Sequence, residues 1–87
     1  MSNRDDELLG LLSRAAFEVS GRRLDELGLD THLDNFGLDS VGVLEIVGYV
    51  EDKLDLRLPD HGIVRLATMR DMVTLVERTR LAAEADG

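Results

Sequence analysis

The fold of this chain is decided by residues 31–40, THLDNFGLDS, which end a long connection and begin a helix. Gly37 permits a tight turn, and Asp39 places a carboxylate directly before the hydroxyl of Ser40. Because apolar residues recur at helical spacing after Ser40, a helix is predicted over 40–54. Taken alone, a serine at the start of a helix is an ordinary cap, so its meaning depends on its surroundings.

The predicted helix over 40–54 carries two apolar faces. A helix of this kind either lies centrally in a core or offers one face to partner proteins, and both alternatives stay open. The inward stripe consists of Val43, Ile46, Val47, Val50 and Leu54. The candidate docking set on the second face consists of the apolar positions Val41, Leu44 and Gly48 and the acidic residues Glu45, Glu51 and Asp52.

Three more helices are predicted around it, so the fold class is all-α, a small four-helix bundle with a long loop between helices one and two. The first helix covers 5–19 and ends at Ser20-Gly21. Pro59 interrupts the chain before a short third helix over 61–66. The last helix runs from 68 to about 83. At its start, Thr68 and Asp71 have the spacing of a capping box. No strand is predicted.

The connection over 22–39 is long, but it is not featureless. Regularly placed apolar side chains can pin it onto the core, and a short extra helix over 24–27 is an alternative that leaves this interpretation unchanged. The pinning residues are Leu24, Leu27, Leu29, Leu33 and Phe36.

Length and composition bound the class of protein. The 87 residues are expected to form a single domain covering 1–87. The chain contains no cysteine, which rules out disulfides and cysteine metal sites and suits a reducing cytoplasm, where we expect the protein to be located. No apolar run approaches the roughly 20 residues that span a bilayer, so no membrane association is expected.

The net charge of −8 is concentrated around the 31–40 stretch. Residues 24–60 hold ten acids and two bases, a net of −8, whereas the remainder holds eight of each sign. Such a field repels nucleic acid and attracts basic protein surfaces. A solvated acidic surface that only keeps the domain soluble is the alternative.

Residues 36–40, FGLDS, resemble the prosthetic-group attachment site of the acyl carrier protein family, and the resemblance extends over about residues 7–81. It implies a non-catalytic carrier on which 4′-phosphopantetheine from coenzyme A is esterified to Ser40 and holds acyl groups as thioesters. Asp39 matches the family aspartate that lies near the metal of the modifying transferase, with a helix cap as its alternative. The resemblance also implies an apolar crevice between the second and third helices. The crevice candidates, for which plain core packing is the alternative, are Ile46, Val50, Leu66 and Met72.

The partners implied by the resemblance are a phosphopantetheinyl transferase and acyl- or aminoacyl-loading enzymes, acyltransferases or ketosynthases with basic docking surfaces. Neither nucleic acid nor membrane is expected as a partner, and the carrier is expected to be a monomer. Residues 33–40 are closer to fatty acid and polyketide carriers than to peptidyl carriers. Glycines stand at Gly42 and Gly48, where fatty acid carriers have other residues. Both are expected on the docking face and favour a dedicated pathway, such as polyketide or related secondary-metabolite biosynthesis.

Two other functions stay open at this point. One is a discrete aminoacyl or peptidyl carrier of a nonribosomal-peptide-type pathway, and the other is a helical protein-interaction domain without a prosthetic group. A metal site is not expected, because His32 and His61 lack ligand spacing and Asp30, Asp34 and Asp39 do not match a calcium loop. Both histidines are expected to be ordinary surface residues. The sequence offers no convincing catalytic triad.

Overall fold

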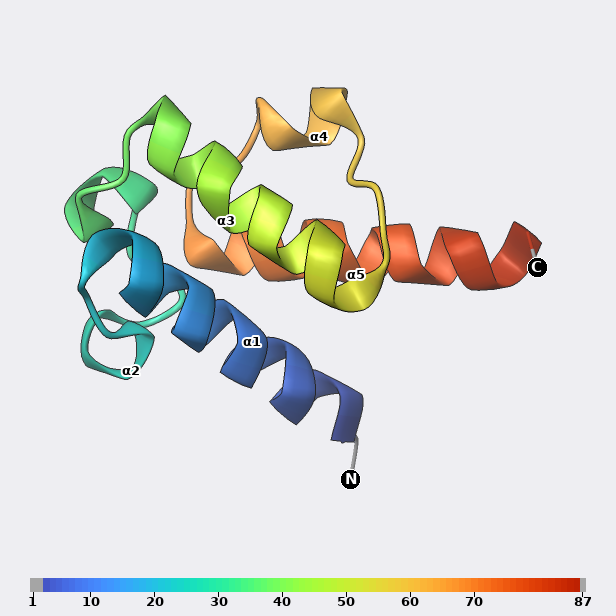
Figure 1. Ribbon diagram of the computed structural model, residues 1–87, viewed down its shortest axis with the longest axis horizontal. Coiled ribbons are helices and arrows are strands. Elements are labelled where there is room, and N and C mark those ends of the chain that lie inside the picture. The colour runs from blue at the N-terminus through green and yellow to red at the C-terminus, as the bar shows by residue number, and fades with distance from the viewer. Residues whose placement is uncertain (1–2, 87) are drawn as a thin grey trace.

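The computed structural model describes residues 3–86, and these residues form helices and connecting turns (Figure 1). Within this range no strand is present, and the one β-type contact is an isolated bridge between His32 and Thr68. The predicted all-α bundle is therefore confirmed. Its elements are α1 (Asn3–Ser20), α2 (Leu24–Leu27), the 3-10 helix η1 (Leu33–Phe36), α3 (Ser40–Leu54), α4 (Asp60–Ile63) and α5 (Met69–Asp86).

The three long helices enclose the core. Helix α1 packs against α3, and α1 also contacts α2 and the last helix, α5. In Figure 1, α1 and α3 run in opposite directions, while the short elements α2 and η1 lie together at one end of the bundle. That end also holds the last turn of α1 and the first turn of α3, so the 31–40 stretch lies where several elements meet.

Helix α3 has the boundaries predicted for it, since it covers Ser40–Leu54. Local signals fix both ends. At the start, the Asp39 side chain accepts a hydrogen bond from the backbone N–H of Gly42. At the end, Asp55 adopts a left-handed conformation with φ of 53°, and its N–H donates to the carbonyl oxygen of Glu51.

The predicted capping box of the last helix is confirmed. The Asp71 N–H donates to Thr68 Oγ1 at 3.1 Å, and the Thr68 N–H donates to Asp71 Oδ2 at 3.1 Å. The helix covers Met69–Asp86, so it extends three residues beyond the predicted end. Helix α1 ends at Ser20 as expected, and Gly21 follows with φ of 75°.

The third helix differs from its prediction over 61–66, because α4 covers only Asp60–Ile63. Pro59, with φ of −70°, precedes the first residue, so the helix begins directly after the proline. Beyond Ile63 the chain tightens, since the N–H groups of Arg65 and Leu66 bond to carbonyl oxygens three residues earlier. The predicted segment is thus helical at its start and a tight turn at its end.

The core is aliphatic and is completed by the connections. The predicted pinning of the 22–39 connection is confirmed, because Leu24, Leu33 and Phe36 are buried and Leu27 and Leu29 pack against the core. The alternative short helix over 24–27 is also present as α2. Fully burying such side chains contributes about 1.5–3 kcal/mol each. The helical part of the core consists of Leu8, Leu12, Ala15, Ala16, Ile46, Val47, Val50, Met69, Met72 and Val76.

Candidate functional site

Two adjacent residues at the start of α3 have different structural roles. Asp39 is the N-cap, and its carboxylate Oδ1 accepts a hydrogen bond of 2.8 Å from the N–H of Gly42. Its carbonyl oxygen accepts a second bond from the N–H of Val43 at 2.9 Å. Ser40 is the first helical residue, so its hydroxyl is not needed as the cap.

The hydroxyl of Ser40 is exposed and forms no hydrogen bond with residues 3–86. The other serines whose side chains the structure describes, Ser13 and Ser20, are half-buried. The Ser20 hydroxyl is also committed, because it donates to the carbonyl oxygen of Ala16 at 2.6 Å. Of the serines that the structure describes in full, Ser40 is therefore the one that an outside enzyme can reach.

A pocket of about 710 Å³ opens beside Ser40. Its volume falls in the range of about 300–1,000 Å³ that is usual for small-molecule sites. It lies between the start of α3 and the segment that joins α4 to α5. The lining residues are His32, Leu33, Asp34, Leu38, Asp39, Ser40, Val43, Leu44, Ile63, Val64, Leu66 and Ala67.

The crevice candidates do not share one location. Leu66 lines this pocket, whereas Ile46, Val50 and Met72 are fully buried in the core and lie outside its lining. The other apolar lining residues are Leu33, Leu38, Val43, Leu44, Ile63, Val64 and Ala67. Spacing along the helix could not separate these groups, because the pocket is formed with a segment about 20 residues away in the sequence.

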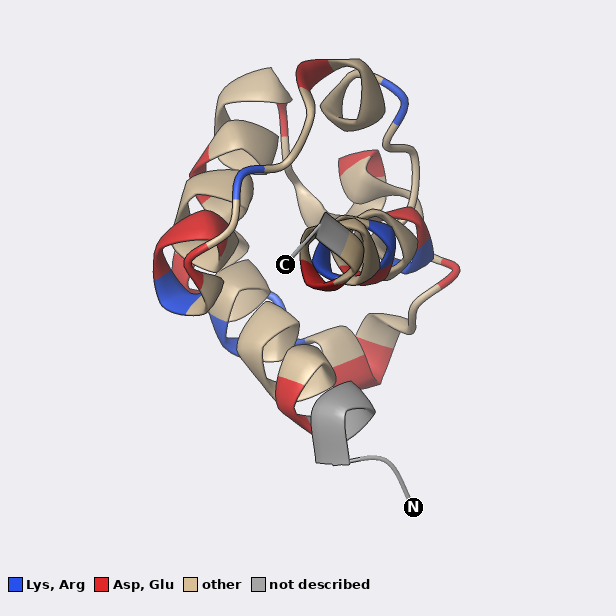
Figure 2. Cartoon of the chain, turned by 90° about the vertical axis from the view of Figure 1, so that its right-hand side faces the viewer, with Lys and Arg blue, Asp and Glu red and all other residues tan. Residues whose placement is uncertain are grey.

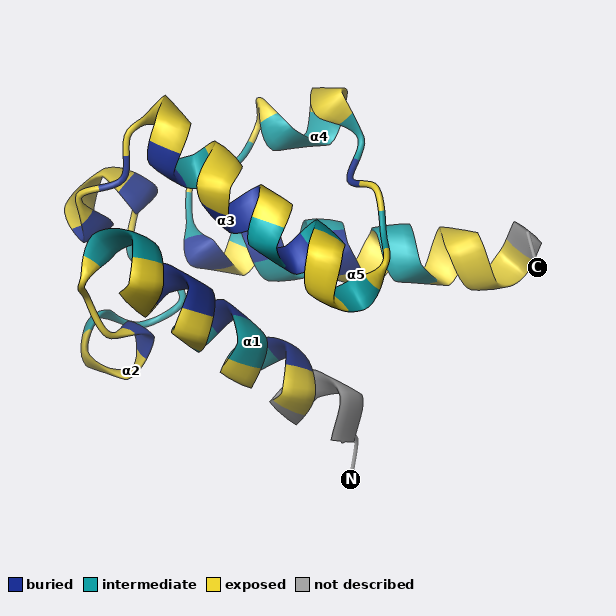
Figure 3. Cartoon of the chain, in the orientation of Figure 1, coloured by how far each residue is buried: buried dark blue, intermediate teal, exposed yellow. Residues whose placement is uncertain are grey.

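The second apolar face of α3 points to solvent, as the docking set requires. Val41 is 62% exposed and Leu44 is 56% exposed, while Gly48, Glu45 and Asp52 are also exposed. Figure 3 shows exposed segments recurring along α3 from its first turn. We call Val41, Leu44, Glu45, Gly48 and Asp52 the α3 patch.

Glu51 has a different environment from the rest of the predicted docking set. It is half-buried, and its Oε2 accepts a hydrogen bond of 2.8 Å from the backbone N–H of Leu58. The carboxylate thus holds the segment between α3 and α4 against the helix. This bond joins Glu51 to Leu58, which lies beyond the end of α3, where helical periodicity gives no signal.

The expected place of Gly42 on the docking face is wrong. Gly42 is buried, and a Cβ at this position would lie 3.0 Å from Leu38 Cδ2 and 3.6 Å from Val19 Cγ1. The glycine thus allows α1 and the 31–40 stretch to approach the first turn of α3. Gly48 behaves as expected, because it is exposed and a Cβ there would meet nothing within 4 Å.

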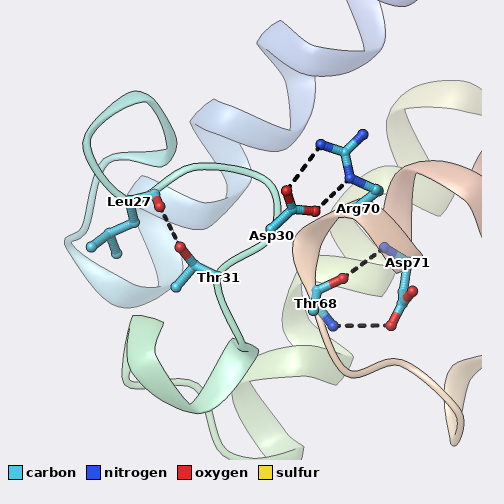
Figure 4. A network of polar contacts seen from close by, with 6 residues as sticks. All are labelled: Leu27, Asp30, Thr31, Thr68, Arg70 and Asp71. Atoms are coloured by element: carbon cyan, nitrogen blue, oxygen red, sulfur yellow. Dashed lines mark hydrogen bonds and ion pairs between the residues drawn. The ribbon is translucent and has the colours of Figure 1, made fainter.

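Contacts with α5 hold the loop that leads to Ser40 (Figure 4). The Arg70 guanidinium donates to both carboxylate oxygens of Asp30, at 2.6 and 3.4 Å. The hydrogen bond and then the positive charge of Arg70 lower the pKa of Asp30. Backbone bonds join the same segments, because the N–H of Leu33 donates to Ala67 and that of Arg70 donates to Leu29, both at 2.9 Å. Thr31 Oγ1 also donates to the carbonyl oxygen of Leu27.

The charge around the site is mainly acidic. Figure 2 shows acidic segments on α3 and on the loops around it, whereas several basic segments lie on α5. Within residues 3–86, no group of three or more metal-ligating side chains is gathered in one place. Nor does that part of the chain contain a helix with the length and apolar character needed to cross a membrane.

An exposed serine at the start of a central helix, with a pocket beside it, is typical of a carrier domain. Residues 11–76 match the family described as "Phosphopantetheine attachment site". The chain belongs to this family of acyl carrier proteins, whose members are non-catalytic and carry a covalently attached 4′-phosphopantetheine. Family members interact with a phosphopantetheinyl transferase and with acyl-processing enzymes.

Known acyl carrier proteins resemble the chain over most of its length. The acyl carrier protein of Rhodococcus erythropolis is 28% identical over 88 residues, covering 100% of this chain and 92% of that protein. The acyl carrier protein of Beutenbergia cavernae is 31% identical over 77 residues, covering 87% of this chain and 94% of that protein. A crystal structure of an acyl carrier protein from Thermotoga maritima has the same fold, with a TM-score of 0.78 at 23% identity, covering 90% of this chain and 92% of that one.

Proposed function

We propose that Ser40 carries the 4′-phosphopantetheine arm of this acyl carrier protein and that the loaded arm delivers acyl groups to partner enzymes. The observation that carries this proposal is the exposed hydroxyl of Ser40, which has no hydrogen bond within residues 3–86. Since Asp39 already caps α3, esterification of Ser40 removes no contact that the helix needs.

The chemistry of attachment is a phosphoryl transfer. Ser40 Oγ attacks the β-phosphorus of coenzyme A, and a new O–P bond forms as the pyrophosphate bond breaks. Adenosine 3′,5′-bisphosphate leaves, and the hydroxyl proton passes to a base of the transferase, whose Mg²⁺ neutralises the phosphate charge. The resulting phosphodiester lies at a helix N-terminus, where unpaired N–H groups and the helix dipole favour an anion. Asp39, next to Ser40, is the residue that we propose lies near the metal of the transferase during this step.

Intact mass spectrometry tests the attachment. The chain, incubated with coenzyme A and a broad-specificity phosphopantetheinyl transferase, is expected to gain the mass of one phosphopantetheine group. Ser40→Ala is expected to gain nothing, whereas Ser13→Ala, a half-buried serine on α1, is expected to gain the group normally. A wild-type protein that gains no mass contradicts the proposal and favours a helical interaction domain without a prosthetic group.

We further propose that the α3 patch is the surface recognised by partner enzymes with basic docking surfaces. Two exposed apolar side chains, Val41 and Leu44, lie on the same helix as the exposed acidic residues Glu45 and Asp52. Exposed apolar side chains accompanied by charged ones are common at transient interfaces. The charge of the 24–60 segment supports basic partners, because it steers positively charged surfaces toward the patch.

The α3 patch is tested with pairs of variants matched for exposure. Leu44→Asp and Glu45→Lys are expected to lower the second-order rate of phosphopantetheinyl transfer by about tenfold or more, the loss typical of interface hot spots. The matched controls are Leu81→Asp and Glu77→Lys on α5, since Leu81 is 61% exposed and Glu77 is also exposed. Unchanged rates in Leu44→Asp and Glu45→Lys contradict the proposed surface.

The pocket beside Ser40 is proposed as the shelter for the start of the acyl chain. Its apolar lining, which includes Val43, Leu44, Ile63 and Leu66, offers cover within reach of the attached arm. Leu66→Asp places a charge in that lining and is expected to speed hydrolysis of a short acyl thioester. The carboxylate draws water into the pocket, so the thioester is less protected. The same rate in wild type and variant contradicts the shelter.

For the pathway, we propose polyketide or related secondary-metabolite biosynthesis, with an aminoacyl or peptidyl carrier as the second candidate. Gly48 supports a dedicated partner set, because it leaves the α3 patch without a side chain at its centre. Gly42 does not support a dedicated partner set, because it is buried and lies outside the α3 patch. The mass of the acylated protein isolated from its native host distinguishes the two candidates, because an aminoacyl group and a ketide differ in elemental composition.

A further inference from the structure

One ionisable side chain in the pocket beside Ser40 has no part in the function proposed so far. The polar lining of the pocket comes from His32, Asp34, Asp39 and Ser40. Among the described residues that line it, His32 alone is able to carry a positive charge, whereas Asp34 and Asp39 carry negative charge at neutral pH. The pocket therefore pairs one potential cation with the attachment hydroxyl.

The backbone of His32 is firmly placed, while its side chain is uncommitted. An antiparallel bridge joins His32 to Thr68, and the next residue, Leu33, donates its N–H to Ala67 at 2.9 Å. His32 precedes η1 as its N-cap, but its imidazole forms no capping hydrogen bond. The side chain is exposed, so the ring can turn toward a group placed at the pocket mouth.

Attachment of the arm changes the charge of this pocket. A phosphodiester on Ser40 adds a full negative charge to a site that already holds two carboxylates. Asp39 has its Oδ1 engaged by the N–H of Gly42. The other lining residues from α3 and from the segment after it are apolar, namely Val43, Leu44, Ile63, Val64, Leu66 and Ala67, while the exposed Arg65 does not line the pocket. His32 is therefore the one lining side chain that can meet the phosphodiester with an opposite charge and donate a charge-assisted hydrogen bond to it.

We propose that His32, in its protonated form, binds the phosphodiester on Ser40 and acts as a positioning residue that holds the arm at the mouth of the pocket. This inference rests on the proposed attachment at Ser40. Protonated His32 anchors the base of the arm beside the pocket, and neutral His32 releases it. The groups that share the pocket with His32 and set this balance are Asp34 on η1 and Asp39 before α3.

Phosphorus NMR of the loaded protein tests the proposal. A phosphodiester does not itself change protonation between pH 5 and 8, so its ³¹P resonance reports a change in a neighbouring group. In the wild type we expect the resonance to shift between pH 5 and pH 8, because histidine is the side chain whose charge changes in this range. The shift is expected to vanish in His32→Gln and to persist in His61→Gln, whose exposed imidazole on α4 does not line the pocket.

The outcomes separate this inference from the proposed function. Intact mass is measured first on each sample, and a wild-type protein without the arm overturns both the attachment at Ser40 and the role of His32. A loaded wild type with a pH-independent ³¹P resonance overturns the role of His32 alone. So does a loaded, folded His32→Gln variant that keeps the wild-type titration.

Discussion

The carboxylate of Asp39 accepts a hydrogen bond of 2.8 Å from the N–H of Gly42, and the hydroxyl of Ser40, which lies between these two residues, is not part of this cap. The cap and the proposed attachment hydroxyl therefore belong to neighbouring residues. The helix keeps its cap whether the serine is free or esterified, so the two roles of the Asp39-Ser40 pair can be separated by mutation.

Asp39 is expected to contribute to stability through its cap and to modification through its charge. Asp39→Ala is expected to lower the free energy of unfolding by about 1 kcal/mol, the usual value of an N-cap. Asp39→Asn retains an oxygen that can accept from Gly42 and is expected to stay within a few tenths of a kcal/mol of the wild type. Urea denaturation measures both values.

The same Asp39→Asn variant tests the second role. Because it removes only the charge, its rate of phosphopantetheinyl transfer is expected to fall while its stability holds. If Asp39→Asn is modified at the wild-type rate, the role of Asp39 is confined to capping α3. If the variant loses as much stability as Asp39→Ala, the amide oxygen does not replace the carboxylate as the cap.

Gly48→Ala is expected to stabilise the protein by about 0.5–1 kcal/mol. Gly48 lies inside α3 on the exposed face, and a Cβ there meets nothing within 4 Å. An added methyl group therefore only reduces the freedom of the unfolded chain. The midpoint of urea denaturation is expected to rise, and an unchanged or lower midpoint disproves the prediction.

Gly62→Ala provides the contrast for this prediction. A Cβ on Gly62 would lie 2.5 Å from Leu75 Cδ1, so α4 and α5 approach each other closely at this glycine. The substitution forces Leu75 or α4 to move, and overpacking of this kind costs about 1–3 kcal/mol. The two glycine variants should thus change stability in opposite directions.

Glu51 is expected to matter more for stability than its acidic neighbour. Glu51→Ala leaves the part-buried N–H of Leu58 without its acceptor, which costs about 1–3 kcal/mol. Asp52→Ala alters an exposed side chain and is expected to change stability by about 0.5 kcal/mol or less. Equal losses in the two variants would exclude a structural role for the Glu51 carboxylate.

The Asp30–Arg70 ion pair is expected to give a small, pH-dependent stabilisation. Both side chains are largely exposed, so the effect at neutral pH is modest. Because the pKa of Asp30 is lowered by Arg70, this stabilisation is complete above the ordinary aspartate pKa of about 3.9 and disappears as the pH falls through the lower folded value. Arg70→Gln removes it.

Urea midpoints of the wild type and Arg70→Gln, compared at pH 7, 5 and 3, check this expectation. The difference between them should be similar at pH 7 and 5 and smaller at pH 3. A difference that grows toward acid has the wrong sign for a carboxylate with a lowered pKa and would disprove the pairing.

Sequence reasoning predicted the parts of this fold that depend on local signals. The bounds of α3 were predicted from the apolar spacing after Ser40, and the cap given as the alternative role of Asp39 is present. The left-handed turn at Asp55 was not predicted. The start of α5 follows from the spacing of Thr68 and Asp71. These contacts join residues at most four apart, so their pattern can be read along the chain. The length of α4 could not be predicted in this way, because a helix of one turn lacks a full period of apolar residues.

The parts that sequence reasoning missed depend on contacts between distant segments. The pocket brings residues 32–44 together with residues 63–67, so the place of His32 beside Ser40 had no signal in the spacing. Gly42 was assigned to the surface, but the packing of Leu38 and Val19 against the helix buries it. Similarly, helical periodicity placed Ile46, Val50 and Met72 on inward-facing sides of their helices. It could not show whether these side chains pack in the core or line the pocket.

The ties between the 29–33 segment and residues 67–70 have a consequence for the order of events during synthesis. Ser40 leaves the ribosome well before residues 67–70, which hold the loop leading to it. A nascent chain therefore exposes the serine while the turn around it still lacks its anchors. If the transferase recognises the folded turn, loading at the proposed site follows folding, because the segment that anchors the loop is made after Ser40.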